Sequence, residues 1–144
     1  DCLLDIKISL IEKEENLYLC CLAFFSFEQT EQNYKEESTL AMNIKKYLDE
    51  NYLEEFILDE LALKFDLTVV HLIRVFKKEF GLPIHSYILN KKVHLAKELL
   101  SSNISISQIA QNSGFFDQSH LNRSFKRIFQ ITPKEYQKNI FSKC

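Results

Sequence analysis

The feature that most constrains the fold of this chain is an internal repeat beyond residue 57. Two segments, residues 72–87 and residues 121–136, are similar in sequence at an offset of 49 positions (121 − 72). The matched residues are Leu72, Arg74, Phe76, Lys77, Lys78, Phe80 and Tyr87 in the first copy and Leu121, Arg123, Phe125, Lys126, Arg127, Phe129 and Tyr136 in the second. Because similar sequences fold alike, we expect the same supersecondary unit to occur twice.

Each copy predicts a short helix, a tight turn and a longer basic helix. Ala62 and Ala110 recur at an offset of 48 (110 − 62), and such a small inner residue lets two helices cross closely. Gly81 follows the first long helix, where a left-handed residue commonly ends a helix. N-caps are predicted at Thr68, Ser105, Asp117 and Thr132, the last in a capping box with Glu135. This is the helix-turn-helix plan, whose second helix can enter the major groove of DNA.

The remaining periodicity is also helical, and no segment requires a strand. We therefore expect an all-α fold, with a seven-helix domain over residues 39–144 and an N-terminal helical pair over residues 1–30. Residues 31–38 are polar without an apolar period and are interpreted as a linker. The expected boundaries within the domain are about 57–81 for the first helix-turn-helix unit, 84–102 for a long linker helix and 105–130 for the second unit.

Three positions depart from the symmetry of the repeat. Gln130 stands where the first copy has Gly81, so we expect the second long helix to close less tightly. Asp66 stands where the second copy has Gly114, and Asp tolerates the left-handed region better than most residues. Ile57 occupies an N-cap position without a side-chain acceptor, so the first short helix is expected to fray.

The two long helices supply the candidate site. We expect Leu72, Val75 and Phe76 to face inward in the first helix. The outward faces then give the base-reading candidates Val70, Ile73 and Arg74 in the first helix and Gln118, Ser119, Asn122 and Arg123 in the second. Arg can grip a guanine edge with two donors, Asn and Ser can bond base edges, and Val or Ile can contact a thymine methyl. The phosphate candidates, one turn later, are Lys77, Lys78, Lys126 and Arg127.

A single helix with such a stripe is usually only a solvated surface, but its recurrence at matching positions favours binding of double-stranded DNA. The charge distribution agrees with this interpretation. Residues 1–38 hold three lysines against nine acidic residues, a charge of −6, whereas residues 39–144 hold 15 basic against 11 acidic residues, a charge of +4. Segments of opposite sign indicate two functional units, and the basic one suits a nucleic acid.

Other classes of function find little support. The glycines Gly81 and Gly114 are both explained by turns, so no Gly-rich phosphate loop exists, and we expect no enzyme. The histidines His71, His85, His94 and His120 lack metal-ligand spacing, so we expect neither metal nor cofactor. The cysteines Cys2, Cys20, Cys21 and Cys144 are interpreted as reduced residues of a cytoplasmic, nucleoid-associated protein. No apolar run reaches the roughly 18 residues of a membrane span.

The segment GFFDQSHLNRSFKRIFQITPKEY, residues 114–136, resembles the C-terminal signature of the AraC/XylS family of bacterial transcription regulators. Residues 58–100 resemble the first helix-turn-helix unit and linker helix of that family, and the match covers about residues 39–140. The resemblance implies a sequence-specific DNA-binding regulator, an activator or a repressor, with two recognition helices in successive major grooves.

Residues 1–30 resemble, less specifically, the paired helices that end the sensor domain in many members of that family. This implies that the chain is a piece of a longer protein and that these residues form a homodimer interface. The effector pocket of the sensor domain would then lie outside this chain.

An alternative function stays open at this point. Val70 and Ile73 make the outward stripe of the first long helix apolar, where polar residues are expected of a DNA reader. Such a face suits a protein-interaction module that docks a helix, for example of an RNA polymerase subunit. The matched Arg74 and Arg123 favour DNA, whereas the apolar stripe favours protein.

Overall fold

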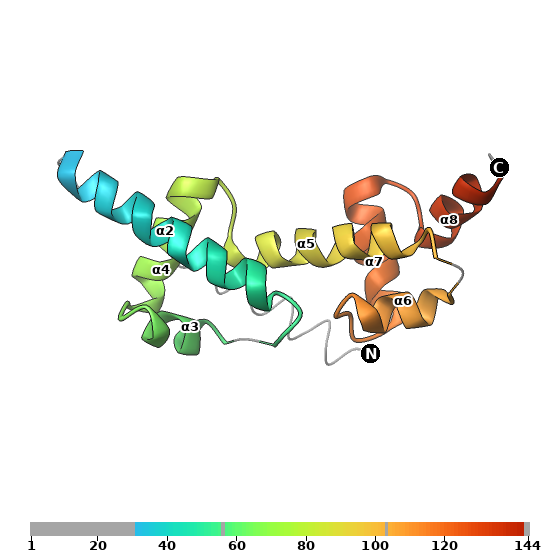
Figure 1. Cartoon of the computed structure of the whole chain (residues 1–144), viewed down its shortest axis with the longest axis horizontal. Helices are drawn as coiled ribbons and strands as arrows, with labels where there is room; N and C mark the ends of the chain where they lie inside the picture. Colours follow the sequence, from blue (N-terminus) through green and yellow to red (C-terminus); the bar gives the residue numbers. More distant parts are fainter. Residues whose placement is uncertain (1–30, 56, 103, 143–144) are drawn as a thin grey trace. The chain divides into compact units, whose positions relative to one another are not determined.

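The fold was obtained as a computed structural model that describes residues 31–55, 57–102 and 104–142, with side chains from Lys35 onward. All regular structure in these ranges is helical, which confirms the expected all-α fold (Figure 1). The seven helices are α2 (Glu31–Asn51), α3 (Leu58–Lys64), α4 (Val69–Phe80), α5 (Ile84–Leu99), α6 (Ile106–Asn112), α7 (Gln118–Phe129) and α8 (Pro133–Phe141). The predicted N-terminal helical pair and the four cysteines lie outside the described residues.

The structure differs from the sequence-based boundaries at two places. Residues 31–38, interpreted as a linker, are helical and form the first two turns of α2. Their sequence lacks an apolar period because the inward position, Glu37, is polar, while Lys35 and Glu36 are exposed. The long helix α5 ends at Leu99, three residues before the expected end at 102. That residues 31–38 connect two domains stays a prediction.

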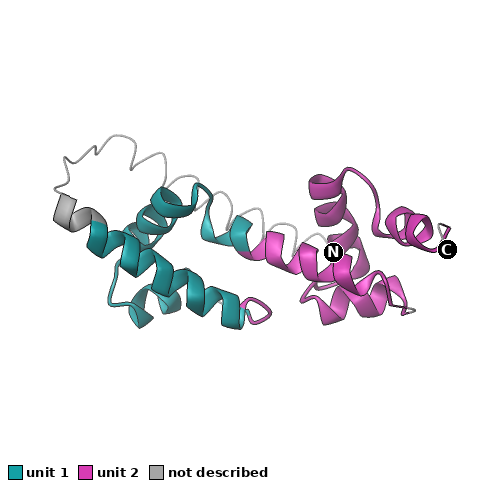
Figure 2. Cartoon of the chain, turned by 45° about the horizontal axis from the view of Figure 1, so that its top comes forward, with its two compact units in different colours: residues 1–51, 55–87 teal, residues 52–54, 88–144 magenta. Residues whose placement is uncertain are grey.

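The chain divides into two compact units, coloured separately in Figure 2. The first unit contains α2, α3, α4 and the first turn of α5. The second unit contains the rest of α5 together with α6, α7 and α8. Each unit therefore holds one pair of helices joined by a tight turn, α3–α4 in the first and α6–α7 in the second.

In the first unit, α4 packs against both α2 and α3. From α2, the residues Ala41, Ile44 and Leu48 are fully or almost fully buried, at the i, i+3, i+7 spacing of one helix face. From α3, Leu61 and Ala62 are buried, and Ala62 occupies the inner position expected of it. Two helices thus cover α4 from different sides.

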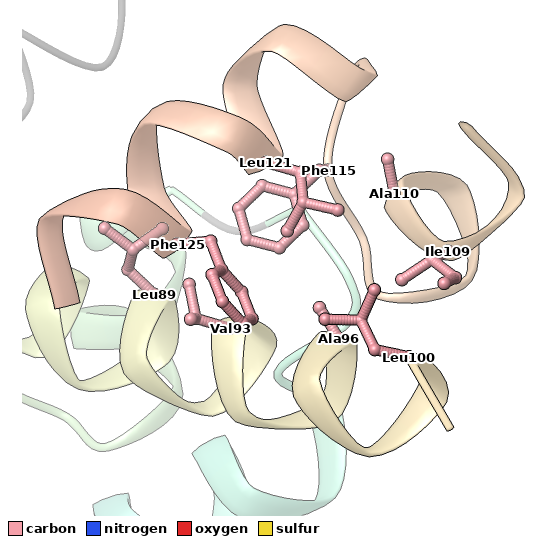
Figure 3. Packing of buried hydrophobic residues seen from close by; sticks show 9 residues of the cluster. All are labelled: Leu89, Val93, Ala96, Leu100, Ile109, Ala110, Phe115, Leu121 and Phe125. Atoms are coloured by element: carbon pink, nitrogen blue, oxygen red, sulfur yellow. The ribbon is translucent and has the colours of Figure 1, made fainter. Parts of the chain in front are cut away.

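The core of the second unit is built in the same way around α7 (Figure 3). Three buried residues of α5 and Leu100, which directly follows it, line this core, and α6, α7 and the turn between them supply the rest. The cluster consists of Leu89, Val93, Ala96, Leu100, Ile109, Ala110, Phe115, Leu121 and Phe125. Small Ala96 and Ala110 leave room among the larger side chains, as the helix-turn-helix plan requires.

An aromatic triad at the end of each long helix shows how closely the two units agree. In the first unit, the ring centroids of Phe76 and Phe80 are 4.7 Å apart and those of Phe76 and Tyr87 are 5.4 Å apart. The corresponding pairs of the second unit, Phe125 with Phe129 and Phe125 with Tyr136, are at 4.7 Å and 5.7 Å. The sequence repeat is therefore a structural repeat down to side-chain packing.

The turns of the two units also match in backbone conformation. Asp66 has φ of 55° where Gly114 has 74°, and Gln130 has φ of 63° where Gly81 has 75°. The expectation that Gln130 closes its helix less tightly is wrong. Its N–H donates to the carbonyl of Lys126 at 2.9 Å, against 2.8 Å for the bond from Gly81 to Lys77. Gln130 adopts the same left-handed conformation despite its side chain.

The predicted helix starts are confirmed. The side chains of Thr68, Ser105, Asp117 and Thr132 each accept a hydrogen bond from the backbone N–H three residues later. Thr132 forms the expected capping box with Glu135, and Ser105 forms a further one with Gln108. The N-cap residue Ile57 makes no side-chain cap hydrogen bond, because its aliphatic side chain has no acceptor.

The left-handed Gln130 leads to a stability prediction. The left-handed conformation costs a residue with a Cβ atom roughly 1–2 kcal/mol, and replacement of Gln130 by Gly would remove this cost. The greater freedom of Gly in the unfolded state offsets about 0.5–1 kcal/mol of the resulting gain in stability. We therefore expect Gln130→Gly to raise the free energy of unfolding by up to about 1 kcal/mol in urea titrations. Lys46→Gly, at an exposed position inside α2, should lower it by about 1 kcal/mol. A loss of stability with Gln130→Gly would contradict a left-handed conformation at position 130.

Candidate nucleic-acid interface

The helix α7 presents a continuous polar face in the second unit. Its N-cap Asp117 accepts a hydrogen bond from the N–H of His120 at 2.6 Å, which fixes the start of the helix. Leu121, Ser124 and Phe125 are buried on the inner face. The predicted site residues Gln118, Ser119, Arg123, Lys126 and Arg127 are exposed, and Asn122 is half-buried at the edge of the same face. The sequence-based division of this helix into two faces therefore matches its burial.

The polar face of α7 has a favourable electrostatic setting for an anion. The first turn, with Gln118 and Ser119, lies at the positive end of the helix dipole. The last turn carries Lys126 and Arg127. The neighbouring Glu135 has a lowered pKa, chiefly because the backbone N–H and the hydroxyl of Thr132 donate to it, with a smaller contribution from Lys126. This carboxylate is thus committed to capping α8.

The corresponding face of α4 differs from its prediction. Val70 is exposed, Arg74 and Lys77 are half-buried, and Lys78 is exposed. Ile73, however, is only 1% exposed and belongs to the core. The expectation that Ile73 faces outward and reads bases is wrong, because a side chain buried in the protein cannot contact a base edge.

The buried face of α4 is wider than the periodicity predicts. The expected inner face carries Leu72, Val75 and Phe76. In the structure, where α4 packs against α2 and α3, the buried residues of α4 also include Ile73. In the second unit the equivalent position holds Asn122, which remains half-buried.

A carboxylate that the sequence analysis did not identify joins the cations of α4. Glu37 of α2 accepts a hydrogen bond from Arg74 Nη2 at 3.0 Å through Oε1 and another from Lys78 Nζ at 3.1 Å through Oε2. His71 Nε2 lies 3.7 Å from Glu37 Oε1. The Glu37 side chain is 14% exposed, against 40% for Arg74. One largely buried acid is therefore shared by three basic side chains.

The signal for Glu37 was present in the sequence. It lies four residues before Ala41 and extends the buried stripe of Ala41, Ile44 and Leu48 by one turn. An acidic residue on a core-facing stripe requires a basic partner. The polar composition of residues 31–38, which is typical of a linker, obscures this signal.

The structure gathers the candidates into two separate groups, one in each unit. Arg74 and Lys78 meet at Glu37, with Val70 and Lys77 on the same helix. Gln118, Ser119, Asn122, Arg123, Lys126 and Arg127 form the group on α7. Their individual DNA-contacting roles stay predictions. Among the described residues, no three His, Cys, Asp or Glu side chains converge as metal ligands would, and no helix has the length and apolarity to cross a membrane.

The corrected place of Ile73 predicts its mutational behaviour. Ile73→Ala should lower the free energy of unfolding by about 2–5 kcal/mol, as removal of a buried aliphatic side chain does. Val70→Ala, at a surface position, should change it by about 0.5 kcal/mol or less. Urea denaturation followed by circular dichroism measures both. Near-native stability of Ile73→Ala would show that this side chain is exposed in solution.

Comparisons with known proteins place this arrangement among characterised folds. The family model described as a helix-turn-helix domain matches residues 61–139. The chain is 28% identical over 130 residues to the probable transcriptional regulator LumQ of Photobacterium leiognathi, covering 90% of this chain and 52% of LumQ. It thus spans about half the length of that relative, and 38% and 20% of two further curated relatives.

Solved structures agree with the fold. The C-terminal domain of the two-component response regulator yesN from Fusobacterium nucleatum is 36% identical, with a TM-score of 0.61, over 73% of this chain and 98% of that domain. A transcriptional regulator from Chromobacterium violaceum, described as an AraC-type DNA-binding domain-containing protein, is 26% identical with a TM-score of 0.61. That match covers 74% of this chain and 94% of the other.

Proposed function

Because this chain belongs to the AraC family of transcriptional regulators, we propose that it regulates transcription by binding double-stranded DNA sequence-specifically through α4 and α7. One observation carries the proposal: Arg74 and Arg123 occupy equivalent positions of the second helix in each unit, and two cations follow each arginine. Two recognition helices that bind one duplex are expected to carry these side chains at the same positions.

On α7, we assign base reading to Arg123, with Gln118, Ser119 and Asn122 as further hydrogen-bonding groups. Lys126 and Arg127, one turn later, are assigned to the phosphate backbone. On α4, Arg74 reads a base edge, and Val70 packs on a thymine methyl. Lys77 and Lys78 contact phosphate.

A protein-docking function is less favoured. Its support was an apolar stripe of Val70 and Ile73 on α4, and the burial of Ile73 reduces that stripe to one exposed aliphatic side chain. Contact with RNA polymerase and a role as an activator remain proposals that would add to DNA binding. A homodimer through residues 1–30 stays a prediction, since these residues lie outside the described part of the chain.

Arg123 gives the most direct test of the proposal. Arg123→Ala should weaken binding to the cognate site by about 1–3 kcal/mol and should relax selectivity at one base pair. Lys126→Ala should instead weaken cognate and random DNA about equally and reduce the salt slope by about 1. Gel shifts at two salt concentrations, with a site selected from fragments of the source genome, measure both effects. Equal losses on both DNAs for Arg123→Ala would assign Arg123 to phosphate.

The spacing of the two half-sites tests the use of both helices. Recognition helices that read successive major grooves require half-sites about 10–10.5 base pairs apart on one face of the duplex. Insertion of five base pairs between the half-sites moves one of them to the opposite face. Affinity should then fall to that of a single half-site. Unchanged affinity would show that the two units do not bind in tandem.

A further inference from the structure

We propose that Glu37 is a positioning residue for DNA recognition, which holds Arg74 in its base-reading geometry and limits the attraction of α4 for DNA of any sequence. The inference rests on the proposed function of α4 as a reading helix. It goes beyond that function by assigning a specificity role to an acidic residue of another helix.

The position of Glu37 is set by the packing of α2. Ala41, Ile44 and Leu48 direct one face of α2 toward α4. Glu37 lies one turn before Ala41 on this face, beyond the end of the apolar core. Ser38, its neighbour, donates a hydrogen bond to Glu79 of α4 at 3.0 Å. The N-terminal part of α2 is therefore attached to α4 by polar contacts, as its middle is by apolar ones.

The contacts of Glu37 leave Arg74 able to read a base. Glu37 accepts one hydrogen bond from Arg74, through Nη2. A guanidinium group has five N–H donors, and a guanine edge requires only two of them. The Arg74 side chain remains 40% exposed. Glu37 can therefore fix the orientation of the guanidinium while the exposed part of the group faces a ligand; Arg74 Nε is buried and makes no hydrogen bond.

The same contacts lower the sequence-independent attraction of α4 for DNA. Nonspecific affinity comes from cations that neutralise phosphates and release counterions. Glu37 places one negative charge within 3.0 Å of Arg74 and 3.1 Å of Lys78. Partial neutralisation weakens the phosphate contact of Lys78 and the general attraction of Arg74 for phosphate, without removing the directional donors of Arg74. Selectivity rises because the nonspecific contribution falls and the specific geometry is preorganised.

The test compares E37Q with E36Q in the full chain. Both substitutions remove one negative charge from neighbouring positions of α2, but Glu36 is exposed, so E36Q controls for net charge. The base pair read by Arg74 is identified first. Its substitution lowers the affinity of the unmodified chain for DNA but not the affinity of R74A. Affinities for cognate, singly substituted and random DNA are then measured at 50 and 200 mM salt.

We expect E37Q to strengthen binding to random DNA and to steepen its salt dependence. One additional phosphate contact should raise the ratio of affinities at the two salt concentrations about threefold relative to E36Q. Discrimination at the base pair read by Arg74 should fall about tenfold in E37Q, the order of one charge-assisted hydrogen bond. E36Q should retain that discrimination.

A double variant separates orientation from charge. In R74A, the further substitution E37Q should have no effect on discrimination at that base pair, because the side chain that Glu37 orients is gone. It should still steepen the salt dependence, since Lys78 loses the Glu37 carboxylate in both backgrounds. If Glu37 had a purely structural role, E37Q would not lower discrimination only when Arg74 is present while steepening the salt dependence in both backgrounds.

Two results would overturn the proposal. Identical behaviour of E37Q and E36Q would show that Glu37 contributes only net charge. A gain in cognate affinity larger than the gain on random DNA would make Glu37 an inhibitory cover of Arg74. Failure of the unmodified chain to bind any DNA refutes the proposed function itself, before a variant is compared.

Circular dichroism would reveal whether E37Q folds. If it does not, a measurement on the unmodified chain tests the positioning role of Glu37 instead. Nitrogen-15 NMR should show separate, slowly exchanging Nη signals for Arg74 at neutral pH, because the Glu37 bond hinders rotation of the guanidinium. Averaged signals typical of a freely rotating arginine would refute the positioning role without any variant.

Discussion

The packing of α4 against two helices at once determines which of its side chains remain available to a ligand. α2 and α3 both contact α4, and Leu72, Ile73, Val75 and Phe76 are the buried residues of α4. The exposed arc that remains is narrow, with Val70 as its apolar member. The same packing brings the N-terminal end of α2 to the cations of α4 and places Glu37 between Arg74 and Lys78. The core and the candidate site are therefore consequences of one arrangement.

Much of the fold could be predicted because its determinants are local in sequence. Caps depend on one side chain and the backbone three residues away, and Thr68, Ser105, Asp117 and Thr132 all cap as predicted. The internal repeat allowed each turn to be predicted from two copies of the sequence. The aromatic triads confirm the repeat, because the equivalent distances between ring centroids differ by at most 0.3 Å, between 5.4 Å and 5.7 Å.

The remaining features could not be predicted because they depend on contacts between distant segments. Periodicity alone gives the direction of a buried stripe but not its width, and Ile73 lies in the part of the buried face of α4 that periodicity did not predict. The polar composition of residues 31–38 concealed a helical segment whose largely buried acid, Glu37, is paired with cations 37 and 41 positions later (74 − 37 and 78 − 37). Gln130 shows a third limit, since the surrounding fold imposed a left-handed conformation on a residue that does not favour it.

The two units thus combine the same backbone plan with different surface chemistry. On α7, Arg123, Lys126 and Arg127 are exposed at the surface. On α4, the equivalent arginine is half-buried beside a carboxylate, and its exposed neighbour Val70 is apolar. If both helices bind DNA as proposed, Glu37 reduces the salt-dependent contribution of α4 to affinity. The first unit then adds selectivity, because a preoriented guanidinium and a methyl contact stabilise the complex only where the sequence matches them.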